Sequence, residues 1–239
     1  MPGRADGGPT VGVVIPAYQA AVTIGDIVTR ARGAVPGAIV YVVDDGSRDG
    51  TGRTAEQGEA GGDTTVLIHP RNRGKGAALA TGIAAALQDG AWVIVTLDAD
   101  GQHPPEAIPG LTAPVLEGAA DLVLGARART AAMPVGRRCT NWLSAALASR
   151  IGGTGIPDAQ TGFRALSRRV AETVQPAERG YAFETAFLLE VLARGLRVAS
   201  VSVPTIYEGR PSYFRQWSDT WRLARVFTRY GRRIIFGAR

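Results

Sequence analysis

Two carboxylates one residue apart end an apolar run in the middle of this chain. Asp98 and Asp100 follow residues 92–97 directly, and Gln102 comes two positions later. Because residues i and i+2 point the same way along an extended chain, the two carboxylates converge just past the end of a strand. Their oxygens and the carboxamide of Gln102 are hard ligands that suit Mg²⁺ or Mn²⁺ carrying a diphosphate. The alternative is an ordinary Asx turn.

Polar residues also follow two earlier apolar runs. The first run leads into Pro16 and Tyr18, and the second leads into Asp44 and Asp45. Open α/β sheets bind ligands at the carboxyl edge, where an acid can accept hydrogen bonds from ribose hydroxyls or base N–H groups. We therefore expect Asp44 and Asp45 to contact a ligand. Asp49 is expected to cap the next helix, because Asp is a favoured N-cap residue.

A glycine-rich basic segment, residues 71–76, contains Lys75 and precedes a predicted helix. Helix starts with free N–H groups and positive charge bind anions, so we expect Lys75 to contact substrate phosphate. The segment lacks the Walker spacing G-x-x-x-x-G-K-[ST]. His69 is expected to lie in a structural turn. His103 is expected to belong to the acid-bearing loop, with substrate contact as the alternative.

The pattern of apolar runs predicts an α/β fold. Near-continuous apolar runs alternate with helical stretches, which indicates a mostly parallel sheet with helices on both faces. The predicted strands are residues 11–15, 38–43, 64–68, 92–97, 121–124, 163–166 and a β segment at 197–207. The predicted helices lie near residues 20–33, 50–60, 75–88, 104–117, 137–151 and 182–194. At 239 residues the chain can bury the core of one large domain, which we place at residues 1–212.

The positive charge of the chain is confined to its end. The net charge is +6, and residues 210–239 contain eight arginines against one acid, Asp219. In a helix, residues 213–236 gather aromatic and aliphatic side chains on one face and arginines on the other. This amphipathic C-terminal helix, taken as residues 213–239, is typical of a membrane surface, and the alternative is a helix packed on the domain. Charge of this kind fits nucleic acid poorly, so no nucleic-acid partner is expected.

The sequence predicts a peripheral membrane protein of the cytoplasm. No apolar stretch approaches the roughly 20 residues needed to span a bilayer, and the first ten residues lack the apolar core of a signal peptide. The single cysteine fits a reducing compartment. We expect the chain to act at the cytoplasmic face of a membrane, which leaves room for a membrane-anchoring partner subunit.

Five motifs together resemble family 2 glycosyltransferases of the GT-A fold, a single Rossmann-like domain. In chain order they are VVIPAYQA, VVDDGSRDGT, NRGKGAALATG, LDADGQHPPE and DAQTGFR. The resemblance covers about residues 11–210 and is greatest to dolichyl- and polyprenyl-phosphate mannose or glucose synthases. It implies a nucleotide-sugar donor, a polyprenyl or dolichyl phosphate acceptor, and inversion at the anomeric carbon. We favour GDP-mannose as the donor, with UDP-glucose next. One departure is Ala20, where the family often has Glu.

The resemblance also implies roles for individual residues. Pro16, Tyr18, Asp44 and Asp45 would line the nucleotide pocket. Asp98, Asp100 and Gln102 would bind ribose and metal. The residues implied on the phosphate and acceptor side are Arg127 for phosphate charge, Arg137 or Arg138 for the acceptor phosphate, and Thr161 and Arg164 beside the acceptor.

The expected chemistry depends on the acceptor. A phosphate monoester has a second pKa of about 6, so a lipid phosphate is already an anion at neutral pH and needs no strong base. A neutral hydroxyl acceptor would need one, and the candidates are Glu184 and Asp158. Glu184 can equally be a solvated residue at a helix start. We expect Asp100, Arg127 and Glu184 to carry the chemistry. A sugar nucleotidyltransferase would instead need a glycine-rich basic loop after the first strand, which IPAYQA does not provide.

Overall fold

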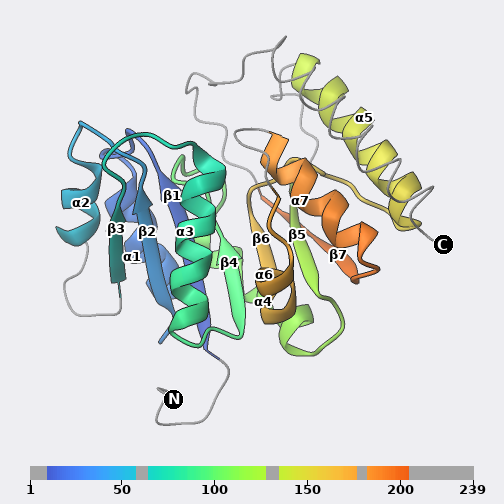
Figure 1. Cartoon of the computed structure of the whole chain (residues 1–239), viewed down its shortest axis with the longest axis horizontal. Helices are drawn as coiled ribbons and strands as arrows, with labels where there is room; N and C mark the ends of the chain where they lie inside the picture. Colours follow the sequence, from blue (N-terminus) through green and yellow to red (C-terminus); the bar gives the residue numbers. More distant parts are fainter. Residues whose placement is uncertain (1–9, 58–63, 128–134, 177–181, 205–239) are drawn as a thin grey trace.

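The computed structural model describes residues 10–57, 64–127, 135–176 and 182–204, with the backbone alone at residues 135–140, 143 and 182 (Figure 1). Within these ranges one seven-stranded sheet has the strand order β3-β2-β1-β4-β6-β5-β7. The strands are β1 (Val11–Ala17), β2 (Ile39–Asp44), β3 (Thr64–Ile68), β4 (Val93–Thr96), β5 (Leu122–Arg127), β6 (Arg164–Ser167) and β7 (Val198–Val203).

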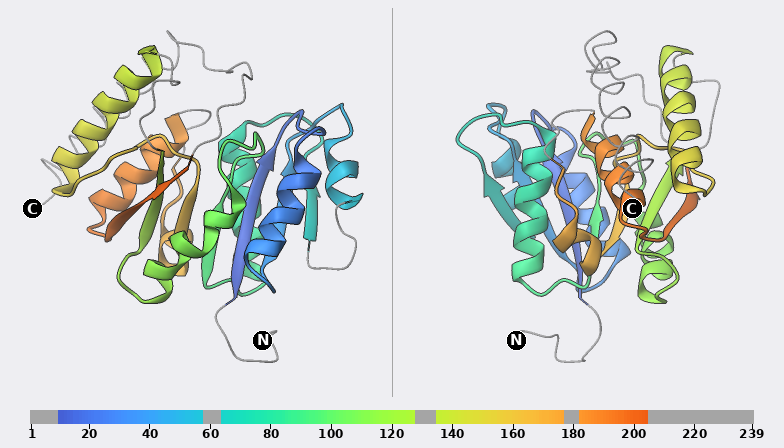
Figure 2. Two further views of the ribbon diagram at one scale, coloured as in Figure 1. Left: turned by 180° about the vertical axis from the view of Figure 1, so that it is seen from behind. Right: turned by 45° about the vertical axis from the view of Figure 1, so that its right-hand side comes forward.

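Helices pack on both faces of this sheet. The helices are α1 (Ile24–Ala34), α2 (Thr51–Gln57), α3 (Lys75–Gln88), α4 (Ile108–Leu116), α5 (Val135–Gly152), α6 (Arg168–Thr173) and α7 (Ala182–Ala193), with a 3₁₀ turn η1 (Pro105–Ala107). In Figure 1 α3 lies in front of the sheet, and from behind α1 and α4 lie in front of it (Figure 2). Two separate hydrophobic cores result, one on each face.

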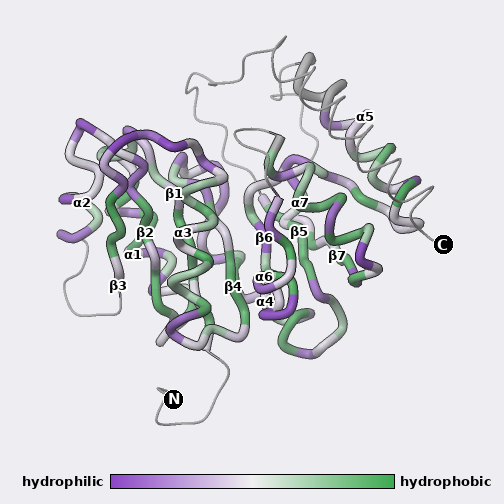
Figure 3. Tube along the Cα trace, in the orientation of Figure 1, coloured by the Kyte–Doolittle hydropathy of each residue, from purple (hydrophilic) through white to green (hydrophobic). Residues whose placement is uncertain are grey.

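The apolar strands alternate between these two cores. In β1 the side chain of Val13 packs into the core with α1 and α4, and Val14 packs into the core with α3 and α7. All seven residues of β1 are buried, as a central strand covered on both faces requires. The strands consist mainly of hydrophobic residues, and hydrophilic residues are concentrated in the loops that connect the elements (Figure 3).

The order and direction of the strands bring distant loops to one edge. Strands β3, β2, β1 and β4 are parallel, so their carboxyl ends lie together. Strand β6 runs antiparallel to β4, with Arg164 opposite Thr96. The loop that leads into β6 therefore reaches the same edge as the residues that follow β4.

The fold agrees with the sequence prediction in class and in nearly every element. The α/β class, the mostly parallel sheet and the helices on both faces are confirmed. The helix predicted near 104–117 begins as η1 and continues as α4, and α6 was not predicted. The predicted C-terminal helix, residues 213–239, lies outside the described residues. None of the described helices is long and apolar enough to cross a membrane.

Candidate active site

A lysine joins two acids from different elements at the carboxyl edge. Lys75 is the first residue of α3, and its Nζ lies 2.7 Å from Oδ1 of Asp98 and 2.6 Å from Oε1 of Glu184. Asp98 follows β4, and Glu184 lies in the first turn of α7. The Glu184 side chain is only 5% exposed, so the alternative of a solvated helix-start residue is wrong. The edge thus holds two carboxylates around one ammonium.

Mutual interaction of these charges shifts their pKa values. Burial alone would lower the pKa of Lys75, but the charges of Asp98 and Glu184 raise it above its usual value. Burial opposes the charge on Asp98, yet the Lys75 ammonium holds the pKa of Asp98 below its usual range. The surrounding protein removes part of the water around the Asp100 carboxyl, and together with the neighbouring Asp98 charge this raises the pKa of Asp100, although the residue keeps an exposed surface. A cation beside Asp100 would relieve this repulsion between like charges.

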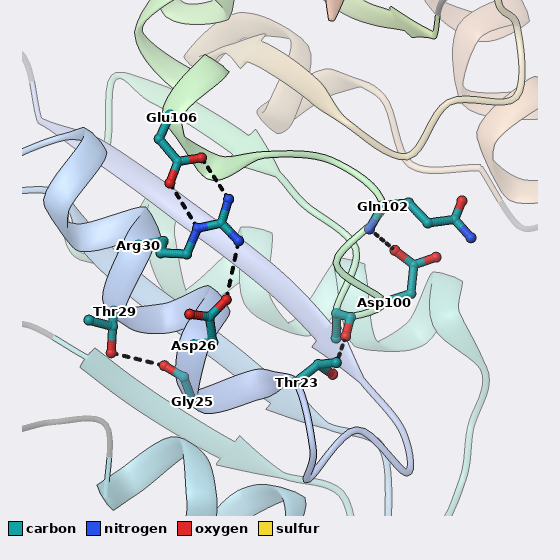
Figure 4. A network of polar contacts seen from close by, with 9 residues as sticks. Thr23, Gly25, Asp26, Thr29, Arg30, Asp100, Gln102 and Glu106 are labelled. Atoms are coloured by element: carbon teal, nitrogen blue, oxygen red, sulfur yellow. Dashed lines mark hydrogen bonds and ion pairs between the residues drawn. The ribbon is translucent and has the colours of Figure 1, made fainter. Parts of the chain in front are cut away.

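Helix α1 holds the acid-bearing loop at both ends (Figure 4). Oγ1 of Thr23 donates to the carbonyl oxygen of Ala99, between the two acids, at 2.7 Å. Farther along, Nε and Nη2 of Arg30 each donate to the Glu106 carboxylate at 2.8 Å. Arg30 also donates to Asp26 at 3.2 Å. The segment between β4 and α4 is therefore held in place by hydrogen bonds to α1 and its N-cap residue Thr23, and not only by hydrogen bonds within its own turn.

The side chains of Asp100 and Gln102 lie beside each other in that loop (Figure 4). The backbone N–H of Gln102 donates to Oδ1 of Asp100 at 3.0 Å, so the Asx turn expected as the alternative is present. It does not exclude a ligand, because Asp100 stays exposed. Within the described ranges no three acidic, His or Cys side chains gather as a metal-binding group. Further ligands would come from the Gln102 carboxamide or from a bound diphosphate.

A glycine lets a second loop approach the acids. A Cβ on Gly162 would lie 2.5 Å from Oδ2 of Asp98, a distance that real Cβ atoms essentially never show. The carbonyl oxygen of Gly162 accepts a hydrogen bond from Oγ1 of Thr96 at 2.7 Å. The loop before β6 is thus fixed to the end of β4, with the Asp98 carboxylate against its backbone. Neither Gly162 nor Thr23 was singled out from the sequence, where a single Gly or Thr carries no distinctive signal.

Arg127 and Asp158 form an ion pair beside this loop. Nε of Arg127 lies 2.7 Å from Oδ2 of Asp158, and Nη2 donates to Oδ1 at 3.2 Å. Asp158 is 1% exposed, and although burial opposes its charge, the Arg127 guanidinium lowers its pKa. A carboxylate with a lowered pKa is a weak base. Asp158 is therefore better described as the residue that orients Arg127 than as a general base.

Thr161 and Arg164 are buried in the loop before β6. Oγ1 of Thr161 donates to the carbonyl oxygen of Gly125 at 2.8 Å. Nε of Arg164 donates to the carbonyl oxygen of Thr161 at 2.8 Å, and burial lowers the pKa of Arg164 to about 10. Among the described residues no carboxylate forms a salt bridge with Arg164 within 4.0 Å. Contact of either residue with an acceptor stays a prediction.

The paired acids after β2 are turned into the protein. Asp44 accepts hydrogen bonds from the backbone N–H groups of Ser47 and Gly52 at 2.9 and 3.0 Å. Asp45 is 3% exposed and likewise accepts from backbone amides of another loop. In this structure both carboxylates therefore organise loops, and their contact with a ligand stays a prediction.

Other predicted site residues differ in exposure. Pro16 is buried within β1, whereas Tyr18 is 51% exposed at the edge. Asp49 lies two residues before α2, one position earlier than an N-cap. Its Oδ1 accepts from the backbone N–H of Thr51, and its Oδ2 accepts from the backbone N–H of Ala21, so it also joins the turn after β2 to the loop after β1. Arg137 and Arg138 lie in the first turns of α5, but their side chains are outside the described residues.

Both histidines are buried. His103 is 4% exposed, with its ring centroid 5.3 Å from that of Phe163. Burial lowers the pKa of His103 to about 4, so the imidazole is neutral at pH 7. Its Nδ1 has no hydrogen-bond partner among the described residues. His69 lies after β3 and does more than form a turn, because both of its ring nitrogens are within hydrogen-bond distance of side chains.

An open, mostly parallel sheet with acids after β4 and a basic helix start beside them is the arrangement that the resemblance to GT-A glycosyltransferases implies. Comparison with known proteins leads to the same family. The family model described as Glycosyl transferase family 2 matches residues 12–175, more than half of the chain. The chain belongs to the family 2 glycosyltransferases.

Three known proteins that are similar to this chain differ in the activities that their names give. Polyprenol monophosphomannose synthase of Mycolicibacterium smegmatis is 34% identical over 80% of this chain and 75% of its own length. UDP-N-acetylglucosamine–dolichyl-phosphate N-acetylglucosaminyltransferase of Methanococcus voltae is 28% identical over 82% and 85%. Glucosyl-3-phosphoglycerate synthase of Mycobacterium tuberculosis, solved with Mn²⁺, UDP and glucosyl-3-phosphoglycerate, has a TM-score of 0.71 at 25% identity and covers 96% of this chain and 81% of its own.

Proposed function

We propose that this glycosyltransferase moves a hexose from a nucleotide sugar to the phosphate of a polyprenyl or dolichyl lipid. The observation that carries the proposal is the cluster of Lys75, Asp98 and Glu184, whose salt bridges of 2.7 and 2.6 Å join three elements at one edge. The chain spans 75% of polyprenol monophosphomannose synthase and 85% of the dolichyl-phosphate N-acetylglucosaminyltransferase, two relatives whose names give a lipid phosphate as the acceptor. GDP-mannose is the favoured donor and UDP-glucose the next.

The residues at the edge suit a single displacement. The acceptor phosphate, already an anion at neutral pH, would attack the anomeric carbon while the bond to the nucleoside diphosphate breaks. The ammonium of Lys75 and the guanidinium of Arg127 would stabilise the charge that develops on the leaving diphosphate. Asp158 would keep Arg127 in place through their 2.7 Å ion pair. Arg137 or Arg138 would bind the acceptor phosphate, and Thr161 and Arg164 would flank the acceptor.

The donor atoms at the edge fit a hard divalent cation. Asp98, Asp100 and Gln102 offer carboxylate and carboxamide oxygens. The pKa of Asp100 is raised by loss of surrounding water and by the neighbouring Asp98 charge, and a cation would offset both effects. Mg²⁺ or Mn²⁺ held there would neutralise charge on the donor diphosphate. A similar solved glycosyltransferase, glucosyl-3-phosphoglycerate synthase, binds Mn²⁺ together with UDP.

A radiolabelled transfer assay tests this function. GDP-mannose and UDP-glucose are offered separately to a short polyprenyl phosphate with Mg²⁺ or Mn²⁺, and the organic phase is counted. Label in the lipid from one donor supports the proposal and identifies the sugar. Asp100→Asn should lose activity by at least about 100-fold, whereas Glu117→Gln, an exposed acid just after α4, should not. Normal activity of Asp100→Asn would remove the metal assignment.

Transfer to a hydroxyl acceptor is the second candidate. It is favoured by Glu184, whose Oε2 is buried without a hydrogen-bond partner among the described residues and could accept a proton. Donor consumption without label in the lipid phase would support it. Glu184→Gln should then abolish transfer, because a neutral acceptor needs a base.

The C-terminal residues 213–239 are proposed to bind the membrane at its cytoplasmic face, either alone or with a membrane-anchoring subunit. Residues 1–212 would form the catalytic domain. The opposition of arginines and aromatic residues in this segment supports the proposal, since each basic residue near an anionic leaflet contributes about 1 kcal/mol. A lipid-phosphate acceptor would bring the active site to the same surface.

A further inference from the structure

A chain of hydrogen bonds between side chains connects the end of β2, the end of β3 and helix α3. Oδ1 of Asp45 lies 2.7 Å from Nδ1 of His69, and Nε2 of His69 lies 3.0 Å from Oγ1 of Thr81 in α3. Asp45 and His69 are 3% and 6% exposed. Side chains at the ends of two strands are therefore joined to the helix that begins with Lys75.

The same carboxylate holds the loop immediately before Lys75. The backbone N–H of Arg73 donates to Oδ1 of Asp45 at 2.9 Å, and that of Gly74 donates to Oδ2 at 2.7 Å. Gly74 precedes α3 and has a φ of 92°, a conformation that other L-residues rarely adopt. The position of this backbone turn sets where α3 starts.

A close backbone contact reinforces this arrangement. Gly46 follows Asp45 with a φ of 76°, and a Cβ there would lie 2.5 Å from the carbonyl carbon of Arg71. The turn after β2 therefore lies directly against the backbone of residues 71–72. Two consecutive residues, Asp45 and Gly46, determine the path of the loop that carries the site lysine.

The hydrogen bonds fill Oδ1 of Asp45 and leave one acceptor position on its Oδ2. Its Oδ1 receives two partners and its Oδ2 one, and a carboxylate oxygen accepts about two. Asp44 differs, because its oxygens bind the amides of Ser47 and Gly52 in its own turn and at the start of α2. The two neighbouring acids thus support different loops.

We propose that Asp45 and His69 are positioning residues that act through Lys75. By fixing the turn at Gly74 they direct the Lys75 ammonium to Asp98 and Glu184, at 2.7 and 2.6 Å. Asp45 thereby strengthens binding of the donor diphosphate whichever nucleobase the donor carries. This inference rests on the proposed function, since it assumes a nucleoside diphosphate at the edge.

Binding of two nucleoside diphosphates tests the proposal. GDP and UDP are titrated with Mn²⁺ into the full chain, its Asp45→Asn variant and the matched Asp44→Asn variant. Asp45→Asn should weaken both nucleotides by the same factor, about tenfold. A change of more than about tenfold in the GDP-to-UDP affinity ratio would show base recognition and overturn the inference alone. If the unmodified chain binds neither nucleotide, the proposed function fails as well.

A double-mutant cycle asks whether Asp45 acts through the lysine. Affinity for UDP or GDP is measured in each variant. Asp45→Asn should lower this affinity about tenfold when Lys75 is present, and less than about threefold when Lys75 has been replaced in Lys75→Met. Equal losses in the two backgrounds would overturn the inference. The cycle of Asp44→Asn with Lys75→Met is the control and should be additive, since Asp44 contacts a different loop.

Two substitutions of His69 keep the test valid if Asp45→Asn does not fold. The amide of Asn reaches about as far as Nδ1 of His, whereas the amide of Gln reaches about as far as Nε2. His69→Asn should therefore keep the bond to Asp45 and most of the nucleotide affinity, and His69→Gln should lose it at a similar melting temperature. The opposite order would contradict a path through Asp45.

Discussion

Ion pairs that include a buried carboxylate, Glu184 or Asp158, are the main contacts of the site at the scale of single residues. Asp158 is 1% exposed, but its partner Arg127 and the backbone N–H of Gln160 at 3.1 Å satisfy the carboxylate. Removing one member of a buried pair leaves a charge without its partner and typically costs about 3–5 kcal/mol. The Arg127–Asp158 pair therefore contributes to the stability of the folded protein and also fixes the position of the Arg127 guanidinium in the site.

The Asp158–Arg127 pair should make stability depend on pH in the acid range. The folded protein lowers the pKa of Asp158, so its contribution is fully present above the unfolded value of about 4 and is lost as pH falls through the folded value. Urea unfolding between pH 2 and 6 measures it. Asp158→Asn should be less stable at pH 6 and should lose less stability on acidification than the unmodified chain. Equal slopes of the two proteins would contradict the assignment.

At the scale of elements, α1 and α3 fix the loops against the sheet. Helix α3 approaches β1 closely, because Gly82 has no side chain where Val14 lies. Helix α1 is bonded to the acid-bearing loop through Thr23 and Arg30 (Figure 4). Rigid elements can thus hold side chains whose own loops have no regular structure.

Gly82→Ala should destabilise the protein by about 1–3 kcal/mol through overpacking. The added Cβ would lie 2.4 Å from Cγ1 of Val14 and 3.1 Å from Cγ2 of Val43, both in buried strands. Gly110→Ala in α4 is the matched control, since its Cβ would meet nothing within 4 Å. That change should raise stability by up to about 1 kcal/mol. Chemical denaturation compares the two, and equal effects would disprove the close approach.

Thr23→Val should weaken metal-dependent nucleotide binding. It keeps the shape of the side chain but removes the 2.7 Å bond to the carbonyl oxygen of Ala99, so the turn between Asp98 and Asp100 loses its anchor. We expect a loss of about 1–2 kcal/mol in stability and a several-fold loss in affinity for UDP or GDP with Mn²⁺. Thr29→Val, which removes only the local bond to Gly25, should leave the affinity unchanged. Unchanged affinity in both variants would exclude the anchor.

At the scale of the whole molecule, the candidate active-site residues and the net positive charge lie in separate parts of the chain. Lys75, Asp98 and Glu184 lie together at one edge of the described sheet, whereas residues 210–239 hold eight arginines. A protein whose acceptor is a membrane lipid needs both parts at the same surface.

Removal of residues 213–239 should abolish binding to anionic vesicles. Flotation with phosphatidylglycerol-containing vesicles measures this, and added salt should weaken binding of the intact chain because surface charges are screened. Circular dichroism and nucleotide binding confirm that the shortened chain is folded. Undiminished flotation of a folded shortened chain would mean that another surface binds the lipid.

Much of this protein was determined by local features of its sequence. The periodicity of apolar residues indicated the strands and helices, and the position of Asp98, Asp100 and Lys75 next to predicted strand or helix ends indicated the edge that holds the site. These features depend on neighbours along the chain, and the spacing of two for a strand is fixed by backbone geometry. The sequence therefore predicted which loops carry the chemistry.

Only the tertiary structure decided which side chains meet. Lys75, Asp98 and Glu184 are brought together because α3 and α7 pack into the same core on one face of the sheet and both begin close to the residues that follow β4. The same packing buried Asp45 against His69 and paired Asp158 with Arg127, roles that no local pattern indicates. Such contacts depend on strand order and direction, which many distant residues determine together through burial of the two cores.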